Sequence, residues 1–133
     1  MSTLQTEVER LHRFFQEWFN GELDDTDAVF AAFASALAEG FHIITPDGQV
    51  LSRAEILAMV RGFRGGWQNS RIWIKEFKLR AELGPVALVT YEEWQDVAGE
   101  VKGRLSSALF ELGDGRDDSL RWLHVHETWL PEG

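Results

Sequence analysis

The spacing of apolar residues changes near Asn69, and this change limits the folds that are open to the chain. Before Asn69, apolar side chains recur every three or four residues, as on one face of a helix; after it, they recur every second residue, as in β-strands. Because the helical segments come first and do not alternate with the strands, the pattern predicts an α+β fold. At 133 residues, the chain is expected to form a single domain over residues 1–133.

The first half of the sequence predicts three helices. Apolar residues spaced by four and three predict a helix over residues 4–19, which ends at Asn20 and Gly21. A second helix is expected from about Asp25 to Gly40. A third begins at "SRAE", where Ser52 and a glutamate three residues later form a capping box.

The strand signals follow. Residues 41–45 predict a short strand that ends at the Pro-Asp-Gly turn. The second half then predicts a four-stranded antiparallel meander, with a phase slip near Lys75 and Glu76 that indicates a β-bulge and a polar loop over residues 113–119. The strand at 86–97 is apolar on both faces, so both faces are expected to be covered by other parts of the structure. The helices are one cover, and we expect a second copy of the chain, in a homodimer through the sheet, to be the other.

Composition excludes several classes of function. The chain has no cysteine, which excludes disulfides and thiolate chemistry and fits a cytoplasmic protein. Its net charge of −9 disfavours binding to nucleic acid, and no apolar run approaches the ~20 residues of a membrane span. Six tryptophans and nine phenylalanines are a large apolar content for one small core. They indicate either a subunit contact or an aromatic-lined cavity.

Two segments carry a resemblance to a known superfamily. They are "FHIITPDGQVLSRAEILAMV" at residues 41–60 and "RWLHVHETW" at residues 121–129, which holds Trp122 and His126 in a Trp-x-x-x-His pattern. With the order of elements, they resemble the SnoaL-like and ketosteroid-isomerase-like domains of the nuclear-transport-factor-two-like superfamily. The nearest branch is uncharacterised and also resembles the association domain of calcium/calmodulin-dependent kinase II.

This resemblance implies a cystatin-like cone, with N-terminal helices packed on a curved, mainly antiparallel sheet. It also implies a blind pocket at the open end of the cone and dimers through the outer face of the sheet. It does not imply an activity, because the superfamily includes both enzymes and association domains. Ketosteroid isomerases use a tyrosine on the first helix, where this chain has only phenylalanine and tryptophan. Steroid isomerase activity is therefore not expected.

The histidines are the first candidates for chemistry. His124 and His126 share one face of a regular strand and could ligate a metal, pack at an interface or act as acid and base in a pocket. No third ligand stands at a suitable spacing, so no metal site is expected. His42 either reaches the rim of the pocket, which we favour, or is half-exposed, whereas His12 is expected to be solvated.

A polar strand segment, "TYEEWQD" at residues 90–96, supplies the acidic candidates. Tyr91 and Glu93 share one face, and Trp94 and Asp96 share the other. A carboxylate beside an indole can have a raised pKa and act as a base. The alternative is that these carboxylates are solvated and paired with basic residues on neighbouring strands.

Two hypotheses for function follow, and the sequence leaves open whether the protein is an enzyme. In the first, an apolar pocket binds a small apolar molecule and could transform it by proton transfer, as an isomerase, cyclase or dehydratase does, without cofactor or metal. The alternative is a non-catalytic module for homo-oligomerisation. For the first hypothesis the proton-transfer candidates are His126, His42, Glu93 and Asp96, and the ligand-binding candidates are Trp18, Trp94, Trp122, His124 and Tyr91.

Overall fold

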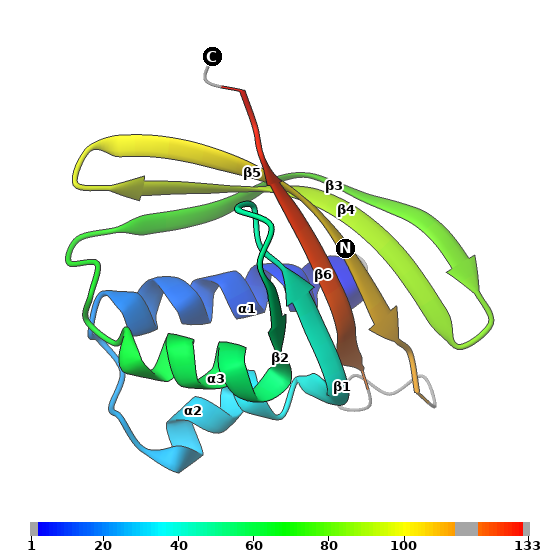
Figure 1. The fold of residues 1–133 in the computed structure, drawn as a ribbon, viewed down its shortest axis with the longest axis horizontal. Coiled ribbons are helices and arrows are strands. Elements are labelled where there is room, and N and C mark those ends of the chain that lie inside the picture. Colours follow the sequence, from blue (N-terminus) through cyan, green and yellow to red (C-terminus); the bar gives the residue numbers. More distant parts are fainter. Residues whose placement is uncertain (1–2, 114–119, 132–133) are drawn as a thin grey trace.

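The structure is a computed structural model that describes residues 3–113 and 120–131. Three helices lie on one side of a curved six-stranded sheet, and β3, β4 and β5 arch over them (Figure 1). In chain order the elements are α1 (Thr3–Phe19), α2 (Asp27–Ala34), β1 (Leu37–Ile44), β2 (Val50–Ser52), α3 (Arg53–Gly62), β3 (Arg71–Leu83), β4 (Val86–Val97), β5 (Glu100–Glu111) and β6 (Arg121–Trp129).

The strands lie in the order β2-β1-β6-β5-β4-β3. Every neighbouring pair is antiparallel except β1 and β6, which run parallel. The meander from β3 to β6 is therefore as predicted, and the α+β class is confirmed. The polar loop expected at 113–119 lies outside the described residues from 114 onward.

Helix α1 supplies much of the core because its apolar stripe faces the sheet and the other helices. Val8 and Trp18 on this stripe are fully buried, and Leu11 is 3% exposed. The indole N–H of Trp18 donates a hydrogen bond of 2.8 Å to the carbonyl oxygen of Val60, so the end of α1 is fixed to α3. The prediction of this helix from its apolar spacing is confirmed.

Helix α2 is shorter than predicted. It begins after Thr26, whose side chain accepts a hydrogen bond from the amide of Val29, and it ends at Ala34. Strand β1 starts at Leu37, which lies beside Trp122 of β6, so pairing with β6 takes over residues that the sequence pattern assigned to the helix. The expected helix end at Gly40 is therefore wrong.

Local signals identified the start of α3 and the bend in β3. Ser52 and Glu55 form the predicted capping box at the N-terminus of α3. The register between β3 and β4 shifts between Lys75 and Lys78, and Glu76 adopts a φ of 56°. This is the predicted bulge. Within the described residues, no helix is long and apolar enough to cross a membrane.

Candidate ligand-binding site

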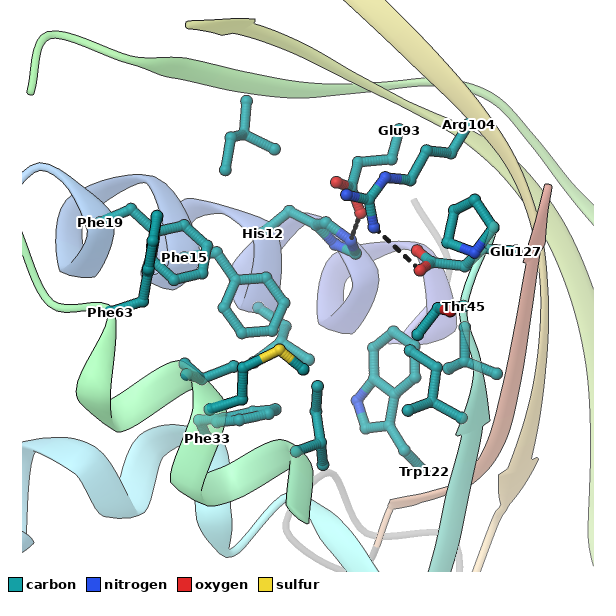
Figure 2. Close-up of a pocket in the computed structure, with 18 of the residues that line it drawn as sticks. His12, Phe15, Phe19, Phe33, Thr45, Phe63, Glu93, Arg104, Trp122 and Glu127 are labelled. Atoms are coloured by element: carbon teal, nitrogen blue, oxygen red, sulfur yellow. Dashed lines mark hydrogen bonds and ion pairs between the residues drawn. The ribbon is translucent and has the colours of Figure 1, made fainter. Parts of the chain in front are cut away.

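A cavity of about 390 Å³ lies between the helices and the concave face of the sheet. Its walls are mainly apolar, and many of them are aromatic rings (Figure 2). Met59 and Phe63 also line it and are 49% and 41% exposed, so an apolar rim marks the opening beside α3. The apolar lining includes Leu11, Phe15, Phe19, Phe33, Leu37, Phe41, Ile43, Ile56, Ile72, Trp122 and Val125.

At one end of the cavity four ionisable side chains form two pairs (Figure 2), and Asp47 is also part of the lining. His12 of α1 lies 2.9 Å from Glu93 of β4, measured from Nε2 to Oε1. Arg104 of β5 donates a hydrogen bond of 3.0 Å to Oε1 of Glu127 on β6. His12, Glu93 and Glu127 are 4%, 8% and 6% exposed, so these charges are held largely away from bulk water.

The hydrogen bonds of His12 define its proton positions. Its Nδ1 lies 2.7 Å from the carbonyl oxygen of Val8, and because a carbonyl can only accept, Nδ1 carries a proton. Nε2 is left to share a proton with Glu93. Burial lowers the pKa of His12, but the charge of Glu93 and its hydrogen bond outweigh burial, so the pKa is raised. Burial likewise tends to raise the pKa of Glu93, yet the nearby His12 and Arg104 lower it overall.

The pKa of Glu127, unlike that of Glu93, is raised overall. Burial and the negative charge of Glu93 raise its pKa to about 7, against the attraction of Arg104 and His12. The guanidinium of Arg104 packs against the ring of Trp129, and Cζ of Arg104 lies 4.8 Å from the ring centroid. Its Nε is buried without a hydrogen-bond partner among the described residues. The site therefore holds one fixed ion pair and one carboxyl group that can gain or lose a proton near neutral pH.

The structure brings three of the sequence-predicted site residues to this cavity. Tyr91, Glu93 and Trp122 line it, and Tyr91 is 1% exposed. Burial raises the pKa of Tyr91 well above its ordinary value, so its phenol stays neutral. The indole N–H of Trp122 donates to Glu7 of α1 at 2.9 Å, which fixes the ring against the helix. Trp18 lies in the core, stacked on Phe14.

The other predicted residues lie elsewhere. Between Trp122 and His124 the β6 strand has a bulge, because Phe110 pairs with Trp122 while Leu109 pairs with His124. The bulge reverses the alternation, so Val125 and Glu127 face the cavity and His126 between them is exposed on the other face. His124 and His126 therefore still share a face, but it is the face opposite the cavity, whereas Trp122 on the other side of the bulge lines the cavity.

The remaining three candidates do not reach the polar cluster. His42 is exposed, and its Nδ1 lies 2.7 Å from the carbonyl oxygen of Gly40. Trp94 is on the outer face, where its indole N–H donates to Glu92. The carboxylate of Asp96 accepts from the amide of Gly99 in the turn after β4.

Sequence reasoning missed His12, Arg104 and Glu127. The expectation that His12 is solvated is wrong, because the side chain is buried and paired with Glu93. A signal was present: His12 follows Val8 by four residues and precedes Phe15 by three, which places it on the apolar stripe of α1. In the described ranges, no group of three or more His, Cys, Asp or Glu side chains is arranged to hold a metal ion.

Comparison with solved structures assigns the superfamily. A protein of unknown function from Pseudomonas aeruginosa, described as NTF-2 like, superposes with a TM-score of 0.88 at 26% identity and covers 98% of this chain and 100% of its own. A calcium/calmodulin-dependent kinase II hub from S. rosetta superposes with a TM-score of 0.74 at 8% identity, covering 96% and 95%, which shows a shared fold alone. The predicted nuclear-transport-factor-two-like superfamily and the cystatin-like cone are confirmed.

Sequence comparison is more specific. Sucrose-phosphatase 1 of Nicotiana tabacum is 27% identical over 133 residues, which cover 93% of this chain but 30% of that protein. The chain thus spans under a third of the length of the curated relatives that it matches. A family described as sucrose-6-phosphate phosphohydrolase C-terminal matches residues 5–131, which is nearly the whole chain. The chain therefore belongs to the sucrose-6-phosphate phosphohydrolase C-terminal family.

Proposed function

We propose that this chain binds a small, mainly apolar molecule that carries one polar group. The supporting observation is a cavity of about 390 Å³ with aromatic and aliphatic walls that ends at the four ionisable side chains. Cavities of this size and lining are typical of small-molecule sites, in which a few polar groups fix the orientation of the ligand. The apolar body would lie against Phe15, Phe33 and Val125, and the polar group would meet Arg104 and Glu127.

The same lining disfavours a sugar phosphate as the ligand, although the curated relatives are named sucrose-phosphatases. A disaccharide carries many hydroxyl groups, and each hydroxyl buried without a partner costs roughly 1–3 kcal/mol. The walls formed by Leu11, Phe15 and Ile43 offer no such partners. A phosphate would also have to approach the carboxylate of Glu93. The activity of the full-length relatives is therefore not assigned to this cavity.

Proton transfer is the reaction that the site would support if the chain is an enzyme. A carboxyl group whose pKa lies at about 7, as that of Glu127 does, is able both to accept and to return a proton at neutral pH. In such a reaction the ionised form of Glu127, which coexists with the protonated form at neutral pH, would take a proton from a carbon next to a carbonyl group and return it to another atom of the same molecule. Arg104 would stabilise the negative charge that develops on the carbonyl oxygen. Because the proton returns to the same molecule, the reaction needs no oxidant and no cofactor.

A thermal-shift screen tests the binding proposal. The panel contains bicyclic ketones such as 1-indanone, the matching alcohols and hydrocarbons, sucrose and sucrose 6-phosphate. We expect a ketone to raise the melting temperature with a saturable dose response, because it combines an apolar body with one polar group. Stabilisation by sucrose or its phosphate alone would overturn the proposal, as would the absence of any shift across the panel.

A second candidate function, homo-oligomerisation through the outer face of the sheet, rests on a separate observation. Leu88 and Leu109 are paired across β4 and β5 on this face, and Leu105 and Val101, farther along β5 on the same face, are 43% and 53% exposed. Apolar side chains gathered on one face favour an interface between copies of the chain. The fold shared with a kinase hub is compatible with such a role.

Sedimentation of a Leu105→Asp variant tests this second candidate. The charged side chain should dissociate a sheet-to-sheet dimer, because it would be buried without a partner. The control is Leu79→Asp: Leu79 is 51% exposed, but it pairs with Val89 and so lies on the opposite face. A monomeric wild type, or equal dissociation by both variants, would contradict an interface on this face.

A further inference from the structure

We propose that Glu93, held by His12, is a positioning residue that keeps Glu127 as a proton donor toward the cavity. The inference rests on the proposed binding function and assigns different roles to the two carboxylates and their cationic partners. One carboxylate is fixed in its charged form by an imidazolium. The second carboxylate, placed near the first on the same face of the sheet, is left to hold a proton.

The arrangement of the strands supports this division. Glu93 is paired in register with Arg104 across β4 and β5, while Glu127 is on β6 at the other side of Arg104. Hydrogen bonds link Arg104 to Glu127 at 3.0 Å and Glu93 to His12 at 2.9 Å. Each carboxylate therefore has its own hydrogen-bonded cationic partner, and the two partners come from different elements.

The Nε2 proton of His12 is shared with Glu93. Because Nδ1 is committed to the carbonyl oxygen of Val8, Nε2 can only share its proton with Glu93. Burial of the pair keeps water from competing for that proton, since His12 and Glu93 are 4% and 8% exposed. Glu93 thus presents a lasting negative charge beside Glu127, and two carboxylates that share a buried site do not both ionise readily.

The charged groups around Glu127 have opposing effects on its ionisation. Arg104 of β5 and His12 of α1 favour its ionised form, whereas Glu93 of β4 and burial favour its protonated form. Asp47, in the turn between β1 and β2, also lines the cavity and adds a further negative charge near Arg104. Glu93 is the strongest of the charged contributors, so its removal should release the proton of Glu127.

The consequence for the ligand is a matching hydrogen-bond pattern. With Glu127 protonated, its O–H and the guanidinium of Arg104 are both donors at the polar end of the cavity. The polar group of the ligand would then be an acceptor, such as a carbonyl oxygen. When Glu127 ionises at higher pH, one of the two donors is lost, so binding of an acceptor should weaken.

Carboxyl-detected NMR titration of the ligand-free chain tests the proposal. In the wild type Glu127 should titrate near neutral pH, with a pKa of about 7. In Glu93→Gln its midpoint should fall by about one pH unit or more. The control is Glu92→Gln, which removes a carboxylate from the outer face of the same strand and should leave the midpoint unchanged. An acidic midpoint in the wild type, or an unchanged one in Glu93→Gln, overturns the proposal.

A second measurement on the wild type does not depend on the folding of a variant. The ¹⁵N shifts of His12 should report both ring nitrogens as protonated across the pH range in which Glu127 titrates. A neutral His12 ring in that range would overturn the proposal, because Glu93 would then hold the shared proton. Neither titration uses a ligand, so failure here is distinguishable from failure of the thermal-shift screen.

Discussion

Nε2 of His12 lies 2.9 Å from Oε1 of Glu93, although 81 residues separate the two in the sequence. The contact joins the first helix to the central part of the sheet at the polar end of the cavity. Forming a buried ion pair costs desolvation, but leaving one partner alone costs more, because a charge is then buried without compensation. The stability of the fold should therefore be sensitive to substitutions in this pair.

The first prediction concerns the loss of this pair. His12→Phe keeps a ring on the apolar stripe of α1 but leaves the buried carboxylate of Glu93 without its partner. We expect the free energy of unfolding at neutral pH to fall by about 3–5 kcal/mol. Denaturant unfolding measures this change.

The double variant His12→Phe/Glu93→Leu is the matched control. It removes both polar partners, so it should be markedly more stable than the single variant. Equal stability of the single and double variants would show that the two residues do not interact in the folded protein.

The second prediction is a pH dependence of stability. The pKa of Glu127 rises from 4.5 to about 7 on folding, so the folded state binds more protons between these pH values. The free energy of unfolding contributed by Glu127 should therefore fall as pH rises through this window, by up to roughly 3 kcal/mol. Glu127→Gln removes this dependence, and its stability relative to the wild type should improve between about pH 5 and pH 8.

Denaturant unfolding of both proteins across this pH range provides the measurement. In the folded state of both proteins His12 and Glu93 are expected to stay charged across this range, so the difference between the two proteins reports on Glu127. A difference that stays constant with pH would show that Glu127 titrates as an ordinary exposed glutamate.

The third prediction concerns access to the cavity. Met59 lies at the rim and is 49% exposed, so Met59→Trp should narrow the opening without disturbing the core. We expect binding of any ketone found in the thermal-shift screen to weaken by about tenfold or more. Isothermal titration calorimetry measures the dissociation constant of the ketone for both proteins.

Ala58→Trp is the control for this variant. Ala58 is the preceding residue on α3 and is exposed, so a tryptophan there adds the same bulk to the same helix. Equal weakening by both substitutions would show that the ligand does not enter past Met59.

The fourth prediction tests the packing of the outer face of the sheet. A Cβ added at Gly103 would lie 2.8 Å from the indole ring of Trp94, which is closer than van der Waals contact allows. Gly103→Ala should therefore lower the free energy of unfolding by about 1–3 kcal/mol. Gly40→Ala is the matched control, because a Cβ there meets nothing within 4 Å. A neutral Gly103→Ala would mean that Trp94 moves aside freely.

The elements that the sequence predicted well are those with local causes. The capping box at Ser52, the stripe on α1 and the bulge near Glu76 each depend on residues close together in the chain. The parallel pairing of β1 with β6 was not predicted, because it joins residues some 80 positions apart, as in Leu37 with Trp122. The early end of α2 follows from the same long-range pairing.

The candidate site was predicted only in part for a similar reason. Glu93 was one of several candidates taken from both faces of its strand, and Trp122 was identified through the Trp-x-x-x-His resemblance; both line the cavity. Glu127 was missed because the bulge in β6 shifts the alternation by one residue, and no glycine or proline in β6 marks that position. His12 was missed because its partner, Glu93, lies on a distant strand, and burial of a histidine is favourable only with such a partner.

An NMR titration of the wild-type chain with 1-indanone tests the binding of a small apolar molecule most directly. The methyl signals of Ile43, Ile56 and Val125, which line the cavity, should shift saturably, while sucrose at the same concentration should leave them unchanged. Lining signals that respond to sucrose and not to the ketone, or to neither compound, would contradict the account.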